Sequence, residues 1–69
     1  MILQDTKSLG KAIRDHRKSM GLSQLNAAGL CGVGERFLSE LERGKTTAEL
    51  GKVLQVLNRL GLRIRLDAQ

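Results

Sequence analysis

The stretch LSQLNAAGLCGVGERFLSELERG, residues 22–44, constrains the fold of this chain more than any other. Ser23 stands where its hydroxyl can accept a backbone N–H that has no partner inside the helix that follows. Apolar residues then recur at helical spacing until Gly32, which suits the left-handed backbone of a sharp turn. A second helix is predicted over residues 35–43, and a glycine ends it. Two short helices around a glycine turn predict a helix-turn-helix.

Helices are also predicted on both sides of this motif. Before it, residues 9–20 place their apolar side chains on one helical face, after a cap at Thr6 or Ser8. After it, a helix is predicted over about residues 48–60. Its expected apolar face consists of Leu50, Val53, Leu54, Leu57 and Leu60, with Val56 at the flank. The chain is therefore expected to form one all-α domain of four helices over residues 1–69.

The last segment, residues 62–67, changes to a period of two. Leu62, Ile64 and Leu66 alternate with charged residues, which predicts a β-strand with one apolar face. A single strand leaves its backbone groups without partners, so we expect it to pair with the same strand of a second copy. The sequence thus predicts a twofold homodimer, and residues 62–67 are its dimerisation strand.

Charge and composition favour an anionic partner inside the cell. The chain carries a formal net charge of +5, which suits nucleic acid. Its single cysteine excludes an internal disulfide and fits a reducing cytosol. No apolar run approaches the roughly 18 residues of a membrane span. We therefore expect a cytoplasmic, nucleoid-associated protein with no membrane partner.

The outward face of the second motif helix is expected to enter the major groove of double-stranded DNA. Arg36 is the best candidate for a base contact, because its fork matches the O6 and N7 acceptors of guanine. Glu35 and Glu40 share this face; carboxylates near phosphates cost affinity, although they can accept from cytosine amino groups. Gln24, Arg43, Lys45 and Thr46 are expected to hold the DNA backbone. The candidate DNA-binding residues are Gln24, Glu35, Arg36, Ser39, Glu40, Arg43, Lys45 and Thr46.

Two charged residues fall on apolar stripes. Arg17 lies between inward-facing residues of the first helix, and Glu42 lies next to the inward-facing leucines of the second motif helix. A carboxylate there is costly unless it is paired. We therefore predict an Arg17–Glu42 ion pair that orients the two helices, since buried pairs often add little net stability. The alternative is that both side chains reach solvent separately.

Catalysis and metal binding find little support in the sequence. His16 and Cys31 are the only residues of their types, and both fall on apolar stripes. A nucleophile needs a base and an orienting group within reach, and a zinc site needs about four ligands. We therefore expect no catalytic residue, no metal site and no cofactor, and we expect core packing for both residues.

The segments LGKAIRDHRKSMGLSQ and GVGERFLSELERGK closely resemble the lambda-repressor/Cro-like, or Xre-type, helix-turn-helix family. ERGKTTAELGKVLQVLNRLGLRIRL resembles its HipB-like antitoxin branch, and together the likeness runs from Leu9 to Leu66. It implies a DNA-binding homodimer that represses its own operon from a palindromic operator. It also implies a toxin partner, typically a HipA-like serine/threonine kinase. The chain departs from the family pattern at Ala27, usually a larger aliphatic residue, and at His16, usually leucine.

The resemblance also assigns roles to individual positions. Arg17 and Glu42 match a buried pair of the family, and the matching DNA-contacting positions are Gln24, Glu35, Arg36, Ser39 and Glu40. Two alternatives to an antitoxin remain: a stand-alone repressor without a toxin, and a protein-interaction module that does not act on DNA. An enzyme is the weakest of the function classes.

Overall fold

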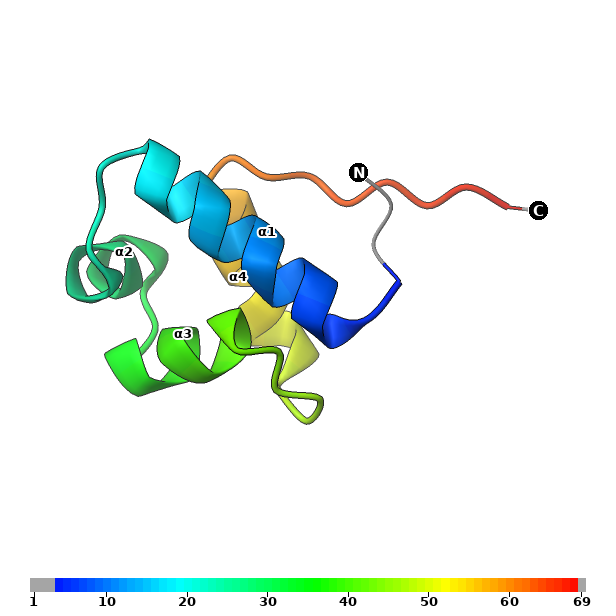
Figure 1. Cartoon of the computed structure of the whole chain (residues 1–69), viewed down its shortest axis with the longest axis horizontal. Coiled ribbons are helices and arrows are strands. Elements are labelled where there is room, and N and C mark those ends of the chain that lie inside the picture. Colours follow the sequence, from blue (N-terminus) through cyan, green and yellow to red (C-terminus); the bar gives the residue numbers. More distant parts are fainter. Residues whose placement is uncertain (1–3, 69) are drawn as a thin grey trace.

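The computed structural model describes residues 4–68 and contains four α-helices. These helices are α1 (Thr6–Ser19), α2 (Gln24–Cys31), α3 (Glu35–Glu42) and α4 (Leu50–Arg59). α1 packs against α3, and α2 packs against both α3 and α4, while the C-terminal segment runs away from the helices (Figure 1). The predicted all-α fold of four helices is confirmed. No described helix has the length and apolar character needed to cross a membrane.

The turn between α2 and α3 forms as the sequence predicts. The Ser23 hydroxyl accepts the backbone N–H of Asn26 at 3.1 Å and caps α2. Gly32 ends α2 with φ 71° and ψ 30°, a left-handed conformation that costs an L-residue energy because of its β-carbon. α3 then begins directly after Gly34. These local features fix the angle at which α3 leaves α2.

The start of α1 corrects one prediction. Asp5 caps this helix, and neither Thr6 nor Ser8 does so. Asp5 has the extended backbone of a capping residue, and its carboxylate accepts the N–H of Ser8 at 2.7 Å, a bond that lowers the pKa of Asp5. The Thr6 hydroxyl instead donates to the carbonyl of Gly44 at 2.7 Å. Thr6 therefore joins α1 to the loop after α3.

The core lies between the four helices. Its ten buried apolar residues are Ile13, Ala27, Ala28, Cys31, Leu38, Leu41, Val53, Val56, Leu57 and Leu60. The prediction for α4 was partly wrong, because Val56 is fully buried whereas Leu50 and Leu54 are 67% and 47% exposed. α2 packs on α4. The apolar surface of α4 is therefore wider than the core of one chain can cover.

The predicted C-terminal strand is not formed in the single chain. Residues 62–68 form no strand in the part of the chain that the structure describes. Leu62 still packs against the core, but Ile64 and Leu66 are 47% and 91% exposed. A strand requires hydrogen bonds to a neighbouring strand. The single chain offers this segment no such neighbour between residues 4 and 68.

Candidate nucleic-acid interface

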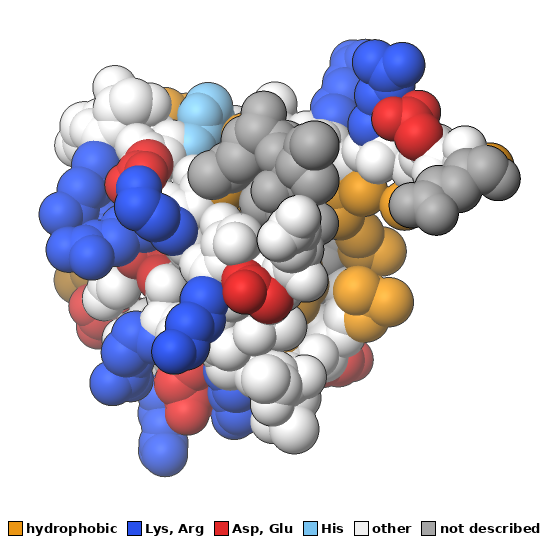
Figure 2. Space-filling model, turned by 45° about the vertical axis from the view of Figure 1, so that its right-hand side comes forward, with side chains coloured by type: hydrophobic (Ala, Val, Ile, Leu, Met, Phe, Trp, Pro, Cys, Tyr) orange, Lys and Arg blue, Asp and Glu red, His pale blue; other side chains and the backbone are white. Residues whose placement is uncertain are grey.

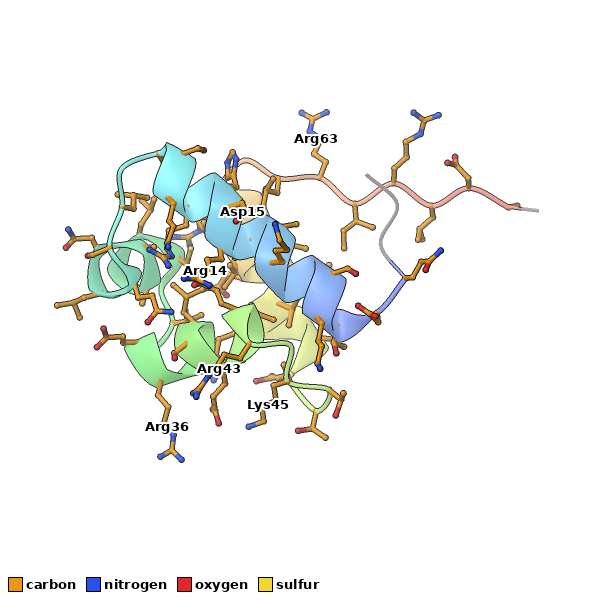
Figure 3. All side chains as sticks on the ribbon, viewed as in Figure 1. Arg14, Asp15, Arg36, Arg43, Lys45 and Arg63 are labelled. Atoms are coloured by element: carbon orange, nitrogen blue, oxygen red, sulfur yellow. The ribbon has the colours of Figure 1, made fainter. Side chains whose placement is uncertain are left out.

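The exposed face of α3 carries the first group of predicted contact residues. Arg36 is exposed and points straight out of the fold, and Arg43 and Lys45 project to the same side (Figure 3). Leu38 and Leu41, on the opposite face of α3, are buried in the core. Burial of that face fixes the helix, so its outer face is presented in one orientation. Glu35 occupies the first turn, where a carboxylate interacts favourably with the free N–H groups of the helix.

Basic side chains gather on part of the surface of the molecule. Figure 2 shows lysine and arginine side chains gathered along one flank, with acidic side chains scattered among them. Glu40 is an acidic residue of α3, and Lys45 Nζ lies 3.5 Å from its Oε1. Glu40 is therefore partly neutralised within the chain. Lys45 and Thr46 are both exposed in the loop after α3, beside the outer face of that helix.

The structure brings Arg17 and Glu42 together. Arg17 donates from Nε to Glu42 Oε2 at 2.7 Å and from Nη2 to Oε1 at 2.9 Å. Their side chains are only 7% and 2% exposed. Arg17 Nη1 donates further to the carbonyl of Leu22 at 2.8 Å. One guanidinium thus links α1 to α3 and to the loop that precedes α2.

Gln24 extends this network from the start of α2. Its Nε2 donates to Glu42 Oε1 at 3.0 Å. The sequence predicted a phosphate contact for Gln24 but gave no sign of this internal bond. An amide nitrogen carries two hydrogens, so one of them remains to serve a ligand. Gln24 therefore both anchors α2 and lies beside the exposed face of α3.

The ionised form of Glu42 is favoured in the folded chain. Burial by itself would raise the pKa of this carboxyl group, but the hydrogen bonds from Arg17 and Gln24 outweigh that effect. The charges of Arg17 and Arg14 act in the same direction, so the pKa of Glu42 lies below its ordinary value of 4.5. The Arg17–Glu42 pair is therefore charged at neutral pH.

Arg14, on the exposed side of α1, is not among the residues predicted from the sequence. Arg14 lines a surface hollow with residues from α2 and α3, and Figure 3 shows it between α1 and α3. Arg14 lies off the apolar stripe of α1, so helical periodicity assigns it no role. The sequence feature that could have pointed to Arg14 is its position three residues before Arg17, about one helical turn from that residue on α1.

Cys31 contacts α4, and His16 contacts the residue that caps the C-terminus of α4. His16 Nε2 lies 2.7 Å from the carbonyl of Leu60, and the buried Cys31 thiol donates to the carbonyl of Val56 at 3.8 Å. Burial raises the pKa of Cys31, which disfavours a reactive thiolate. Among residues 4–68 no three His, Cys, Asp or Glu side chains are placed to hold a metal ion.

A sequence model of a helix-turn-helix domain family matches residues 3–69. The chain belongs to this helix-turn-helix family. A curated relative, the uncharacterized HTH-type transcriptional regulator y4mF of Sinorhizobium fredii (strain NBRC 101917 / NGR234), is 52% identical over 56 residues. The match covers 81% of this chain and 74% of the relative.

Solved structures share the fold over nearly the whole chain. A chain from the HipA-HipB-O2-O3 complex superposes with a TM-score of 0.88 at 20% identity, covering 99% of this chain and 96% of that chain. A chain from the HipB-O4 20mer complex gives a TM-score of 0.87 at 23% identity, covering 100% and 99%. At these identities the similarity is one of fold, and the fold is HipB-like.

Proposed function

We propose that this protein is a homodimeric DNA-binding transcriptional repressor that recognises a palindromic operator in its own promoter. The observation that carries this proposal is the outer face of α3, where Arg36 is exposed and the α3–α1 contact is held by a buried ion pair. The family supports it, since the relative from Sinorhizobium fredii is named a transcriptional regulator. The net charge of +5 adds attraction to the DNA backbone.

In this proposal α3 enters the major groove and reads the operator. Arg36 binds a guanine with both arms of its guanidinium, Glu40 faces the neighbouring bases, and Ser39 contacts a base or a phosphate. The backbone on either side is held by Gln24, Arg43, Lys45 and Thr46, which set the register without reading sequence. Bound protein represses by occluding the promoter, and this mechanism requires no cofactor or catalytic step.

Replacing Arg36 with alanine should weaken operator binding while the protein remains folded. Each lost bidentate guanine contact is worth about 1–3 kcal/mol, or about 5- to 150-fold in affinity for each half-site. The measurement is fluorescence anisotropy with the DNA upstream of the gene and with a scrambled duplex. Arg63→Ala is the matched control, because Arg63 points away from the side that carries Arg36 (Figure 3).

Two outcomes of this titration would contradict the proposal. One is equal, weak binding of the unaltered protein to both duplexes, which would favour a protein-interaction module that does not act on DNA. The other is an Arg36→Ala variant that binds the operator as tightly as Arg63→Ala does.

The dimer is proposed to form through the C-terminal segment and the uncovered side of α4. Leu50, Leu54 and Leu66 are exposed, and they offer a second copy an apolar surface. Residues 62–67 would pair with the same segment of the second copy in a two-stranded sheet. A twofold dimer of this kind sets the two α3 helices about 34–36 Å apart, one turn of DNA.

The double variant Ile64→Gln/Leu66→Gln should be monomeric where the unaltered protein is dimeric, because it removes the apolar face of the proposed strand. Sedimentation velocity over a concentration series measures this change. Arg63→Gln/Arg65→Gln is the matched control, since it places the same side chains on the other face of the segment and should leave the dimer intact. An unaltered protein that sediments as a monomer throughout would overturn the proposed dimer.

A second role, neutralisation of a HipA-like kinase toxin, is favoured by one observation. The fold is shared over 99% of this chain with a chain from a HipA-HipB complex. We infer that the protein is the antitoxin of a type II toxin–antitoxin operon. Co-expression with a kinase-like protein encoded beside its gene should give a stable complex and relieve growth arrest. A stand-alone repressor would have no such neighbour and no such effect.

A further inference from the structure

A hollow of about 360 Å³ lies where α1, α2 and α3 meet. Its lining residues are Arg14, Arg17, Gln24, Ser39, Glu42 and Arg43. Ser39, Glu42 and Arg43 place the hollow beside the C-terminal half of α3, the helix that also carries Arg36. It is thus flanked by the helix proposed to read DNA, and the inference below depends on that proposed function.

The floor of the hollow is electrically balanced. Glu42 accepts from Arg17 through both carboxylate oxygens, and Gln24 donates to one of these oxygens as well. Arg17 uses its remaining terminal nitrogen on the Leu22 carbonyl. The two charges of the buried pair therefore balance each other, and both carboxylate oxygens of Glu42 already accept hydrogen bonds.

The rim of the hollow carries uncompensated positive charge. Arg14 on α1 and Arg43 after α3 are both exposed, and within residues 4–68 neither side chain takes part in an ion pair or hydrogen bond. Ser39 adds a hydroxyl, and Gln24 retains one amide hydrogen that can donate. Two guanidinium groups around one hollow repel each other until an anion lies between them. Guanidinium forks match phosphate geometry closely.

We propose that this hollow binds a phosphate of the DNA backbone, clamped between Arg14 and Arg43. Ser39 and the free amide hydrogen of Gln24 complete the set of donors. α1 is then a third DNA-contacting element, beyond the two helices of the motif. A phosphate contact fixes register but carries no sequence information. Arg14 is therefore a positioning residue for the reading done by Arg36.

The experiment measures DNA binding of Arg14→Gln over a series of salt concentrations, with operator and scrambled duplexes. Each neutralised phosphate contributes a slope of about −0.9 to log K against log[salt]. Loss of Arg14 should make the slope shallower by about 0.9 for each hollow engaged, or about twice that for a dimer. Affinity for both duplexes should fall by a similar factor, about 10-fold at low salt, so the specificity ratio stays unchanged.

Two further variants distinguish the effect of the position and geometry of Arg14 from the effect of its charge alone. Arg63→Gln removes the same charge from the opposite side of the molecule and should leave the slope as it is (Figure 3). Arg14→Lys keeps the charge but loses the fork, so it should restore the slope and only part of the affinity. Because Arg14 is exposed, thermal melts of the three variants should match those of the unaltered protein.

The possible failures of this experiment are distinct. If Arg14→Gln matches Arg63→Gln in slope and affinity, the clamp is overturned while the repressor proposal stands. A loss confined to the operator duplex would make Arg14 a base-reading residue and would also overturn the clamp. If the unaltered protein binds neither duplex, the proposed function fails and the clamp fails with it.

Discussion

Replacing Arg17 with methionine should lower the free energy of unfolding by about 3–5 kcal/mol, the cost of stranding one member of a buried ion pair. Glu42 would remain in the core with a side chain that is 2% exposed, and two of its three hydrogen bonds would be lost. The carbonyl of Leu22 would also lose its donor. Urea denaturation followed by circular dichroism measures the change.

The double variant Arg17→Met/Glu42→Leu separates stability from orientation. An apolar pair of similar volume leaves no buried charge, so most of the lost stability should return. If the ion pair orients α3 against α1, operator affinity should remain below that of the unaltered protein even when stability is restored. Lys11→Met, at an exposed pair with Asp15, is the control and should have little effect. An Arg17→Met variant as stable as Lys11→Met would contradict the prediction.

The Arg17–Glu42 pair also predicts how the stability of the fold changes in acid. The pKa of Glu42 is lowered in the folded chain, so its ionisation stabilises the fold fully above the ordinary value of 4.5. This contribution is lost as the pH falls through the lowered pKa of the folded state. The stability difference between the unaltered protein and Glu42→Gln should therefore shrink below about pH 4.5, as urea titrations at several pH values would show. If the stability difference between the unaltered protein and Glu42→Gln stayed constant from pH 7 to pH 3, this prediction would be contradicted.

Much of the fold could be predicted because the local patterns are consistent with one another. Ser23 and Gly32 bracket α2, and both carry out the capping roles that their chemistry suggests. The helical period placed Arg17 and Glu42 on the inward faces of their helices. Their ion pair could then be predicted, because charged residues on an apolar stripe must find partners. Where residue type, spacing and turn chemistry agree, a single sequence is sufficient to place the element.

The remaining features depend on what lies next to each element, which periodicity does not specify. The apolar stripe of α4 is wider than one neighbour can cover, so the sequence could not tell that Val56 is buried and Leu54 exposed. The alternation in residues 62–67 shows the face of a strand but not its partner. Arg14 joins the candidate site only because α1 crosses near α3, a tertiary arrangement that its own helix does not reveal.

Alanine at Gly10 should destabilise the protein by about 1–3 kcal/mol, the usual cost of overpacking, although alanine is the better helix former. Gly10 is buried where α1 meets α3, and an added β-carbon would lie 2.5 Å from the Leu41 carbonyl oxygen and 2.6 Å from that of Glu42. These are backbone atoms, so no change of rotamer relieves the clash and the two helices must separate. Separation would also strain the pair that Glu42 forms with Arg17.

The other helical glycines provide the comparison for Gly10. A β-carbon at Gly29 or Gly51 would have no neighbour within 4 Å, so alanine there should raise the free energy of unfolding by about 0.5–1 kcal/mol. In thermal and urea unfolding, Gly10→Ala should therefore lower the free energy of unfolding, whereas Gly29→Ala and Gly51→Ala should raise it. If Gly10→Ala is as stable as Gly29→Ala, the helices can move apart freely, and the close crossing does not hold α3 in place. If only Gly10→Ala loses stability, and if it also binds the operator more weakly, then the close crossing of α1 and α3 holds α3 in the orientation that DNA reading requires.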